Sequence, residues 1–160
     1  MSKQLSILSL NINGATSKVE SKVCCDLFNQ YDIVCLSELK CSYPLSLPGY
    51  KCPRSRVVPG EEMRGGVAVF IKTYLWNYVH CVSSLHDQVW FKLHSTPGFY
   101  FGAVYVAPRD SPFFSMESFS SLQEQCHPHG QKCIIMGDFN ARIPDLRLFK
   151  SAALKLGLKP

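Results

Sequence analysis

Hydrophobic and polar positions along the chain form short runs that are typical of β-strands. Residues 5–11 alternate between apolar and polar side chains, whereas residues 32–37 and 132–138 are almost continuously apolar. Alternation predicts a half-buried strand, and a short apolar run bounded by turn residues is consistent with a fully buried one. The same reasoning predicts four further strands, at residues 66–72, 76–83, 88–94 and 99–106.

Two segments carry apolar residues at helical spacing instead. The first covers residues 16–30, where Val19, Val23 and Leu27 recur with the helical period, and the second covers residues 115–125. Helices commonly begin after a Ser or Thr whose side chain accepts a hydrogen bond from the first turn. The candidate caps are Thr16 or Ser17 for the first helix and Ser115 or Ser118 for the second.

The remaining segments are mostly loop. Residues 40–64 contain four prolines and two glycines, which predicts a loop with one short strand near Tyr50 and Val57. A tail helix after residue 145 is limited by Gly157 and Pro160. Many strands with few helices predict an α/β fold of the α+β type, a layered β-sandwich with helices on the outside.

Three predicted strands end in side chains suited to phosphate chemistry. The first strand leads into Asn11 and Asn13, another into Glu38, and the last into Asp138 and Asn140. Residues i and i+2 of a strand face the same side, so a strand that persists to Asn140 places its amide beside the Asp138 carboxylate. That pair can hold and polarise a water beside a phosphate and a hard metal ion. Active sites of layered α/β folds gather where strand ends meet, so we expect one shared site.

Each residue also has an ordinary structural explanation. Asn13-Gly14 is typical of a turn, Glu38 could be a solvated strand end, and Asp138 with Asn140 could form an Asx turn. We consider the Asx turn the less favoured interpretation, because three strands end in the same kind of residue.

The order of these segments resembles the endonuclease/exonuclease/phosphatase superfamily, the deoxyribonuclease-I-like fold, and most closely its apurinic-endonuclease-like branch. Residues 64–71, 88–93 and 101–108 also follow the order found in the endonuclease domain of non-LTR retrotransposons. The resemblance implies a domain over residues 1–145 and a short divergent tail over residues 146–160.

The resemblance also implies roles for individual residues. Glu38 would be the principal ligand of Mg²⁺, with Mn²⁺ as a possible substitute, and Asn11 would orient Glu38, the metal or a phosphate oxygen. Asp138 would align or deprotonate the attacking water, and Asn140 would hold that water or the scissile phosphate. Tyr105 would direct its hydroxyl at the phosphate. The implied partner is DNA, with no small-molecule cofactor, and the oligomeric state stays open.

The family also carries a later Asp-His pair that its chemistry requires, and no such pair follows Asn140. His86-Asp87 and His127-Pro128-His129 do not replace it, and loop solvation is the better explanation of both. We therefore expect a C-terminally truncated domain with weak or no activity, whose second sheet lacks its last strands. We also expect the isolated chain to be poorly soluble or to associate.

Three functions follow from these expectations. The first is a Mg²⁺-dependent DNA-nicking endonuclease of retrotransposon origin. The second is a non-catalytic, domesticated remnant that binds nucleic acid or protein. The third is a small-molecule phosphoesterase of the same superfamily, against which residues 64–71 and 101–108 argue.

Composition adds little. The formal net charge of +5 is compatible with a polyanionic partner, although the basic residues are scattered and Arg64 is by default a surface residue. The eight cysteines contain no C-x-x-C pair, and Cys35 and Cys133 lie inside predicted apolar strands. With no secretory segment and no run long enough to span a bilayer, we expect a reduced intracellular protein, in the nucleus or cytoplasm.

Overall fold

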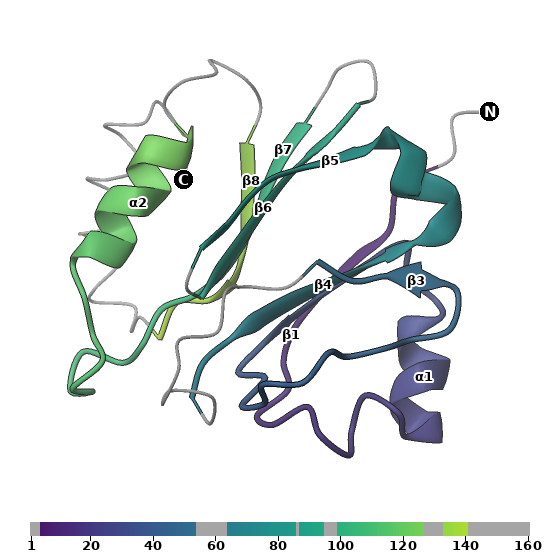
Figure 1. Cartoon of the computed structure of the whole chain (residues 1–160), viewed down its shortest axis with the longest axis horizontal. Helices are drawn as coiled ribbons and strands as arrows, with labels where there is room; N and C mark the ends of the chain where they lie inside the picture. The colour runs from purple at the N-terminus through teal and green to yellow at the C-terminus, as the bar shows by residue number, and fades with distance from the viewer. Residues whose placement is uncertain (1–3, 54–63, 86, 95–98, 127–132, 141–160) are drawn as a thin grey trace.

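The computed structural model describes residues 4–53, 64–85, 87–94, 99–126 and 133–140. They form two four-stranded β-sheets that pack against each other, with one helix on each outer side (Figure 1). The predicted layered α+β fold with outer helices is therefore confirmed. The first sheet has the order β1-β2-β4-β3, from β1 (Ile7–Asn11), β2 (Ile33–Ser37), β3 (Tyr50–Lys51) and β4 (Val67–Lys72). The second has the order β5-β6-β7-β8, from β5 (Val79–Leu85), β6 (Gln88–Leu93), β7 (Phe99–Tyr105) and β8 (Cys133–Asp138).

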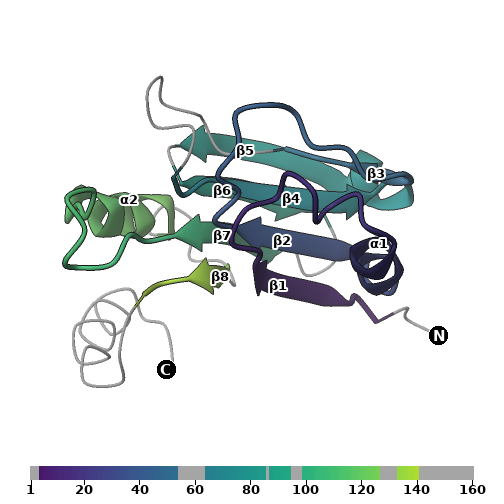
Figure 2. The same ribbon diagram turned by 90° about the horizontal axis from the view of Figure 1, so that it is seen from below.

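Each sheet contains one parallel pair, and these two pairs position the strand ends. β1 runs parallel to β2, and β7 runs parallel to β8. Asn11 is the register partner of Ser37, and Tyr105 is the register partner of Asp138. β1 of the first sheet also lies against β8 of the second (Figure 2). The carboxyl ends of both parallel pairs thus reach one edge of the molecule.

The apolar pattern of β2 is explained by burial on both faces. All five of its residues are buried. Ile33 and Cys35 face the second sheet, whereas Val34 and Leu36 pack with Phe28 at the end of helix α1 (Lys22–Phe28). A strand covered on both faces reads as a continuous apolar run rather than an alternating one.

The first helix begins later than its sequence pattern predicts. Its N-cap is Ser21, whose Oγ accepts a hydrogen bond from the N–H of Cys24 at 3.3 Å, so the prediction of Thr16 or Ser17 is wrong. The preceding residues form turns, in which the N–H of Val19 donates to the carbonyl of Ala15, and Val19 is buried there. An apolar residue in a buried turn therefore imitated the helical period.

The second helix, α2 (Glu117–Cys126), agrees better with the prediction. Ser115 lies just before it, and its Oγ accepts a hydrogen bond from the N–H of Glu117 at 3.1 Å. Ser115 therefore supports the helix start, as one of the two predicted alternatives, whereas Ser118 lies inside the helix. α2 covers the outer face of the second sheet, where Leu122 packs with Trp90.

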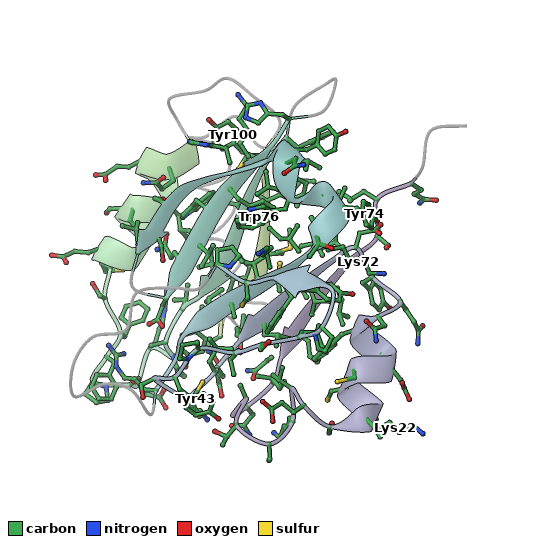
Figure 3. The ribbon with its side chains drawn as sticks, turned by 45° about the vertical axis from the view of Figure 1, so that its right-hand side comes forward. Lys22, Tyr43, Lys72, Tyr74, Trp76 and Tyr100 are labelled. Atoms are coloured by element: carbon green, nitrogen blue, oxygen red, sulfur yellow. The ribbon has the colours of Figure 1, made fainter. Side chains whose placement is uncertain are left out.

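The connection between the sheets is a short helical turn rather than strand. Residues 73–78 form a 3₁₀ helix, η1 (Thr73–Tyr78), and β5 begins only at Val79, so the predicted strand start at residue 76 is wrong. In Figure 3, Lys72, Tyr74 and Trp76 lie together where the first sheet passes into the second. Trp76 packs against the core between the sheets, which the alternating pattern alone could not distinguish from a strand residue.

Val57 and the tail after residue 145, including the predicted domain boundary, lie outside the described residues.

A buried carboxylate, that of Asp32, lies at the end of the first sheet opposite to the carboxyl end of β2. Asp32, which precedes β2, accepts hydrogen bonds from both the N–H and the hydroxyl of Ser6 at 2.9 Å and from the hydroxyl of Tyr74. Asp32 is buried, and these hydrogen bonds satisfy acceptor positions of its carboxylate. Within the described residues, no helix has the length and apolar character needed to cross a membrane.

We expect Cys35 to resist alkylation in the native protein. Its Sγ is buried 3.3 Å from the Sδ of Met136, and burial raises its pKa to about 12. Only the thiolate is nucleophilic, so at pH 8 almost none of the reactive form is present. Mass spectrometry after iodoacetamide treatment should show Cys35 modified only in denaturant, whereas the partly exposed Cys24 reacts in the native state. Equal rates at the two sites would contradict this assignment.

Candidate active site

Residues from the two ends of the sequence meet at the edge where β1 and β8 lie together. The Nδ2 of Asn11 donates a hydrogen bond to the Oδ2 of Asp138 at 2.6 Å, across 127 positions of sequence. The Oδ1 of Asn11 accepts a hydrogen bond from the N–H of Asn13 at 2.9 Å. The amide of Asn11 is therefore oriented on both sides, and it links the first sheet to the carboxylate at the end of the second.

Asn140 does not continue the last strand. β8 ends at Asp138, whose Oδ1 accepts a hydrogen bond from the N–H of Asn140 at 2.9 Å, as in an Asx turn. Asn140 has a left-handed φ of 44°, and its Nδ2 donates to the carbonyl of Val106 at 2.8 Å. The strand does not persist to Asn140, so the two side chains do not share one strand face, and the preference against an Asx turn is wrong. The turn nevertheless orients the Asp138 carboxylate, because both of its oxygens accept defined hydrogen bonds.

Glu38 reaches the same edge through a polar chain. It follows β2, and its Oε2 lies 3.0 Å from the Nζ of Lys40. Lys40 also donates to the Oδ1 of Asn13 at 2.6 Å. Because Asn13 in turn donates to Asn11, one continuous set of contacts connects Glu38 with Asp138.

Tyr105 lies at the end of β7, beside β8. Burial is the main reason that the pKa of its hydroxyl is raised to about 12, so the group is protonated at neutral pH and can donate a hydrogen bond. The carboxylates of Glu38, Asp87 and Asp138 also contribute to the raised pKa, and the guanidinium of Arg64 opposes them.

Arg64 brings a positive charge to this edge. Its guanidinium packs 4.0 Å from the centre of the Phe113 ring, and it precedes Gly65 at the entry to β4. A guanidinium held against an aromatic face keeps its charge and loses part of its freedom. Arg64 is therefore partly ordered by the Phe113 ring, in contrast to the default surface arginine, and its charge lowers the pKa of Tyr105.

Backbone strain is concentrated at the same edge. Within the described residues, the non-glycine residues with left-handed φ all follow strand ends: Asn13, Glu38, Lys40, Asp87 and Asn140. Such conformations cost about 1–3 kcal/mol each and persist where surrounding contacts hold them, which is common at functional sites.

Asp87 is the residue that the sequence pattern missed. The sequence pattern predicts a solvated loop for Asp87 and His86, yet Asp87 is only 8% exposed. Its Oδ1 accepts a hydrogen bond from the N–H of Gly66 at 2.6 Å. The available signal was the short connection between β5 and β6, which favours a left-handed Asp but says nothing of burial. His86, His127 and His129 lie outside the described residues.

The oxygen donors at this edge fit a hard divalent cation. Glu38 offers a carboxylate, and the Asn11 carbonyl oxygen has two lone pairs, of which the bond from Asn13 uses one. No group of three or more His, Cys, Asp or Glu residues suited to a metal occurs among the described residues. Mg²⁺ is commonly held by one or two carboxylates together with waters and substrate phosphates. The donor set therefore fits Mg²⁺, and the assignment of Glu38 and Asn11 as its ligands stays a prediction.

Replacing Lys40 with methionine is expected to tighten cation binding. The Lys40 ammonium now balances the charge of Glu38, so its removal leaves a more negative site. We expect the apparent Kd for Mn²⁺, measured by isothermal titration calorimetry, to fall roughly 3–10-fold. The control is Lys92→Met, because Lys92 packs over the ring of Tyr100 near the start of β7, at the opposite end of that strand from Tyr105. An unchanged or higher Kd in Lys40→Met would contradict the placement of a cation at Glu38.

The chain matches a known protein family in sequence and several solved structures in fold. The profile of the Endonuclease/Exonuclease/phosphatase family matches residues 8–156. The fold is similar to an AP endonuclease from Leishmania major, with a TM-score of 0.75 and 13% identity over 95% of this chain and 66% of that one. It is also similar to the 3′ phosphatase NExo from Neisseria bound to product DNA hairpin, with a TM-score of 0.65 and 19% identity over 96% of this chain and 71% of that one.

A third similar structure is the APE2 catalytic domain from Xenopus laevis, with a TM-score of 0.62 and 20% identity over 95% of this chain and 66% of that one. The chain thus spans 66% of the length of the Leishmania and Xenopus proteins. A comparison with curated protein sequences finds no significant match. The likeness to these structures concerns the fold, whereas the profile match extends over nearly the whole sequence.

Proposed function

The chain belongs to the endonuclease/exonuclease/phosphatase family, and from that premise we propose that it is a metal-dependent phosphodiester hydrolase acting on DNA. The observation that carries the proposal is the hydrogen bond between Asn11 and Asp138, which joins the two sheets at the strand ends. Glu38, Tyr105 and Arg64 supply charges and a hydrogen-bond donor suited to phosphodiester hydrolysis, and the charges of Glu38, Asp138 and Arg64 all act on the pKa of Tyr105.

Each residue has a defined task in this proposal. Glu38 and Asn11 would hold Mg²⁺, or Mn²⁺ in its place, which when bound neutralises charge on the phosphate and the leaving oxygen. Asp138 aligns the attacking water and accepts its proton, because its carboxylate is oriented by Asn11 and Asn140. The hydroxyl of Tyr105, which is protonated at neutral pH, donates a hydrogen bond to a phosphate oxygen.

Asn140 keeps capacity for the substrate. One of its two amide N–H groups is used by the carbonyl of Val106, and a carboxamide nitrogen carries two hydrogens. The second N–H and the carbonyl oxygen can therefore hold the scissile phosphate or the attacking water. In this proposal Asn140 is a binding residue on the Asp138 side of the site.

DNA is the proposed substrate, and nicking is the proposed reaction. One of the similar structures is described as an AP endonuclease and another as bound to a product DNA hairpin. The net charge of +5 favours a polyanion, and Arg64 and Lys40 bring positive charge to the strand ends. The order of the sequence motifs further supports an origin in a retrotransposon endonuclease domain.

A non-catalytic role in nucleic-acid or protein binding is the second candidate. It is favoured by Lys40, whose ammonium compensates the charge of Glu38.

A plasmid-nicking assay separates these candidates. We expect supercoiled plasmid to be nicked with Mg²⁺ and not with a chelator, and the nicking to be lost in Glu38→Ala. The control is Asp26→Ala, because Asp26 is an exposed carboxylate on α1, outside the described site. Nicking that persists in Glu38→Ala would refute the site. If the wild-type protein binds the plasmid but does not nick it, the binding role is favoured. If it hydrolyses inositol phosphates and not DNA, a small-molecule phosphoesterase is favoured.

A further inference from the structure

Asp87 contacts both sheets at the candidate site. Its side chain is nearly inaccessible, and its Oδ1 accepts a hydrogen bond from the N–H of Gly66, which leads into β4 of the first sheet. Its main-chain carbonyl accepts a hydrogen bond from the N–H of Tyr105 at 2.9 Å, at the end of β7 in the second sheet. One residue therefore bonds to both halves of the sandwich where the strand ends meet.

The segment Gly65-Gly66 also forms hydrogen bonds with the two residues that follow Glu38. The carbonyl of Gly66 accepts a hydrogen bond from the N–H of Leu39 at 3.3 Å, and that of Gly65 accepts one from Lys40 at 3.1 Å. Leu39 and Lys40 directly follow Glu38 in the chain. The two glycines thus lie between the Asp87 carboxylate and the loop that carries Glu38.

The close fit at Gly65 shows that the Asp87 carboxylate is packed in place. A Cβ atom at Gly65 would lie 2.5 Å from the Oδ1 of Asp87, so glycine is required for this approach. Gly65 also has a left-handed φ of 51°, which glycine adopts without strain. Asp87 and the Gly65-Gly66 segment therefore form one interlocked unit.

The loop that carries Glu38 depends on such external contacts. Glu38 and Lys40 have φ values of 55° and 50°, and Asp87 itself has a φ of 57°. Strained residues keep these conformations only where neighbouring groups hold them. The hydrogen bonds from Leu39 and Lys40 to the two glycines are contacts of this kind.

We propose that Asp87 is a positioning residue, which sets the placement of Glu38 relative to Tyr105 through its side-chain bond to Gly66 and its main-chain bond to Tyr105. It acts through these neighbours and does not itself touch the substrate. The effect on catalysis rests on the proposed function, whereas the effect on the Glu38 loop does not.

Amide hydrogen exchange measured by NMR tests the structural part. In Asp87→Ala the N–H of Gly66 loses its acceptor, so we expect exchange at Leu39 and Lys40 to accelerate about tenfold relative to the β2 core. Asp87→Asn keeps a side-chain oxygen at the same distance from the backbone and should restore protection. Asp87→Glu keeps the charge but displaces the acceptor by one methylene, so exchange at Leu39 and Lys40 should accelerate as in Asp87→Ala. It replaces Asp87→Ala in the test if the alanine variant does not fold.

Asp32→Ala is the matched control. Asp32 is an equally buried carboxylate at the opposite end of β2, with its own hydrogen bonds to Ser6 and Tyr74. Its loss should destabilise the first sheet without a selective change at Leu39 and Lys40. Unchanged exchange at Leu39 and Lys40 in both Asp87→Ala and Asp87→Glu would overturn the proposal.

Kinetics of plasmid nicking test the catalytic part. A misplacement of about 1 Å commonly costs up to 10²-fold in rate, so we expect kcat of Asp87→Glu to fall about 10- to 100-fold, with KM changed little. Asp87→Asn should stay within about threefold of the wild type, because the hydrogen bond is kept. A kcat loss in Asp87→Asn as large as in Asp87→Glu would overturn positioning through this bond. If the wild type does not nick DNA, the proposed function fails, and the exchange rates at Leu39 and Lys40 still decide the role of Asp87.

Discussion

Replacing Asp138 with asparagine is expected to lower the Mg²⁺-dependent rate of DNA nicking by about 10²–10⁴-fold. The two oxygens of Asp138 accept hydrogen bonds from the Nδ2 of Asn11 and the N–H of Asn140. A carboxamide has one oxygen and one NH₂ group, so it can satisfy only one of these donors. The variant therefore lacks the carboxylate that accepts the proton of the water, and its carboxamide is no longer held by both hydrogen bonds.

Two measurements make this result specific. Circular dichroism and thermal unfolding should show that Asp138→Asn remains folded, because Asp138 lies at the rim of the sheet and is only partly buried. The control is Asp26→Asn, which changes the net charge equally on the distant helix α1 and should nick at the wild-type rate. Nicking by Asp138→Asn within a few-fold of the wild type would show that Asp138 does not act on the water.

Replacing Gly137 with alanine is expected to destabilise the fold more than the same substitution at the other described glycines. Gly137 precedes Asp138 in β8, has a φ of 144°, and pairs with Val104 of β7. A Cβ atom there would lie 1.8 Å from the carbonyl oxygen of Val104, which is backbone and cannot turn away. We expect the free energy of unfolding to fall by about 3 kcal/mol or more, since strain and overlap act together.

The matched control separates strain from overlap. Gly49 has a φ of 82°, also in the left-handed region, but a Cβ atom there meets nothing within 4 Å. Gly49→Ala should therefore cost only about 1 kcal/mol, from the backbone conformation alone. Urea unfolding followed by circular dichroism measures both variants. Equal losses in the two variants would show that β8 moves away from β7 to accept the methyl group.

Local patterns in the sequence were sufficient for most of the strands. β2, β4, β6, β7 and β8 lie within about one residue of the predicted segments, because alternation and apolar runs report directly on the faces that a strand buries. The same patterns failed where a buried turn imitated a helix, at Val19, and where a 3₁₀ turn imitated a strand, at Trp76. In both cases a single apolar side chain reached the core from irregular backbone, which periodicity cannot detect.

The candidate site required the tertiary structure. The sequence by itself determined that polar residues end several buried strands and that the chain resembles a phosphodiesterase family, since both are properties of short segments. Only the packing of the two sheets decided that Asn11 bonds to Asp138, that Asn140 leaves the strand in a turn, and that Asp87 is buried between Gly66 and Tyr105. These contacts join residues from different strands, and their geometry depends on sheet pairing and close packing, which no local stretch of sequence encodes.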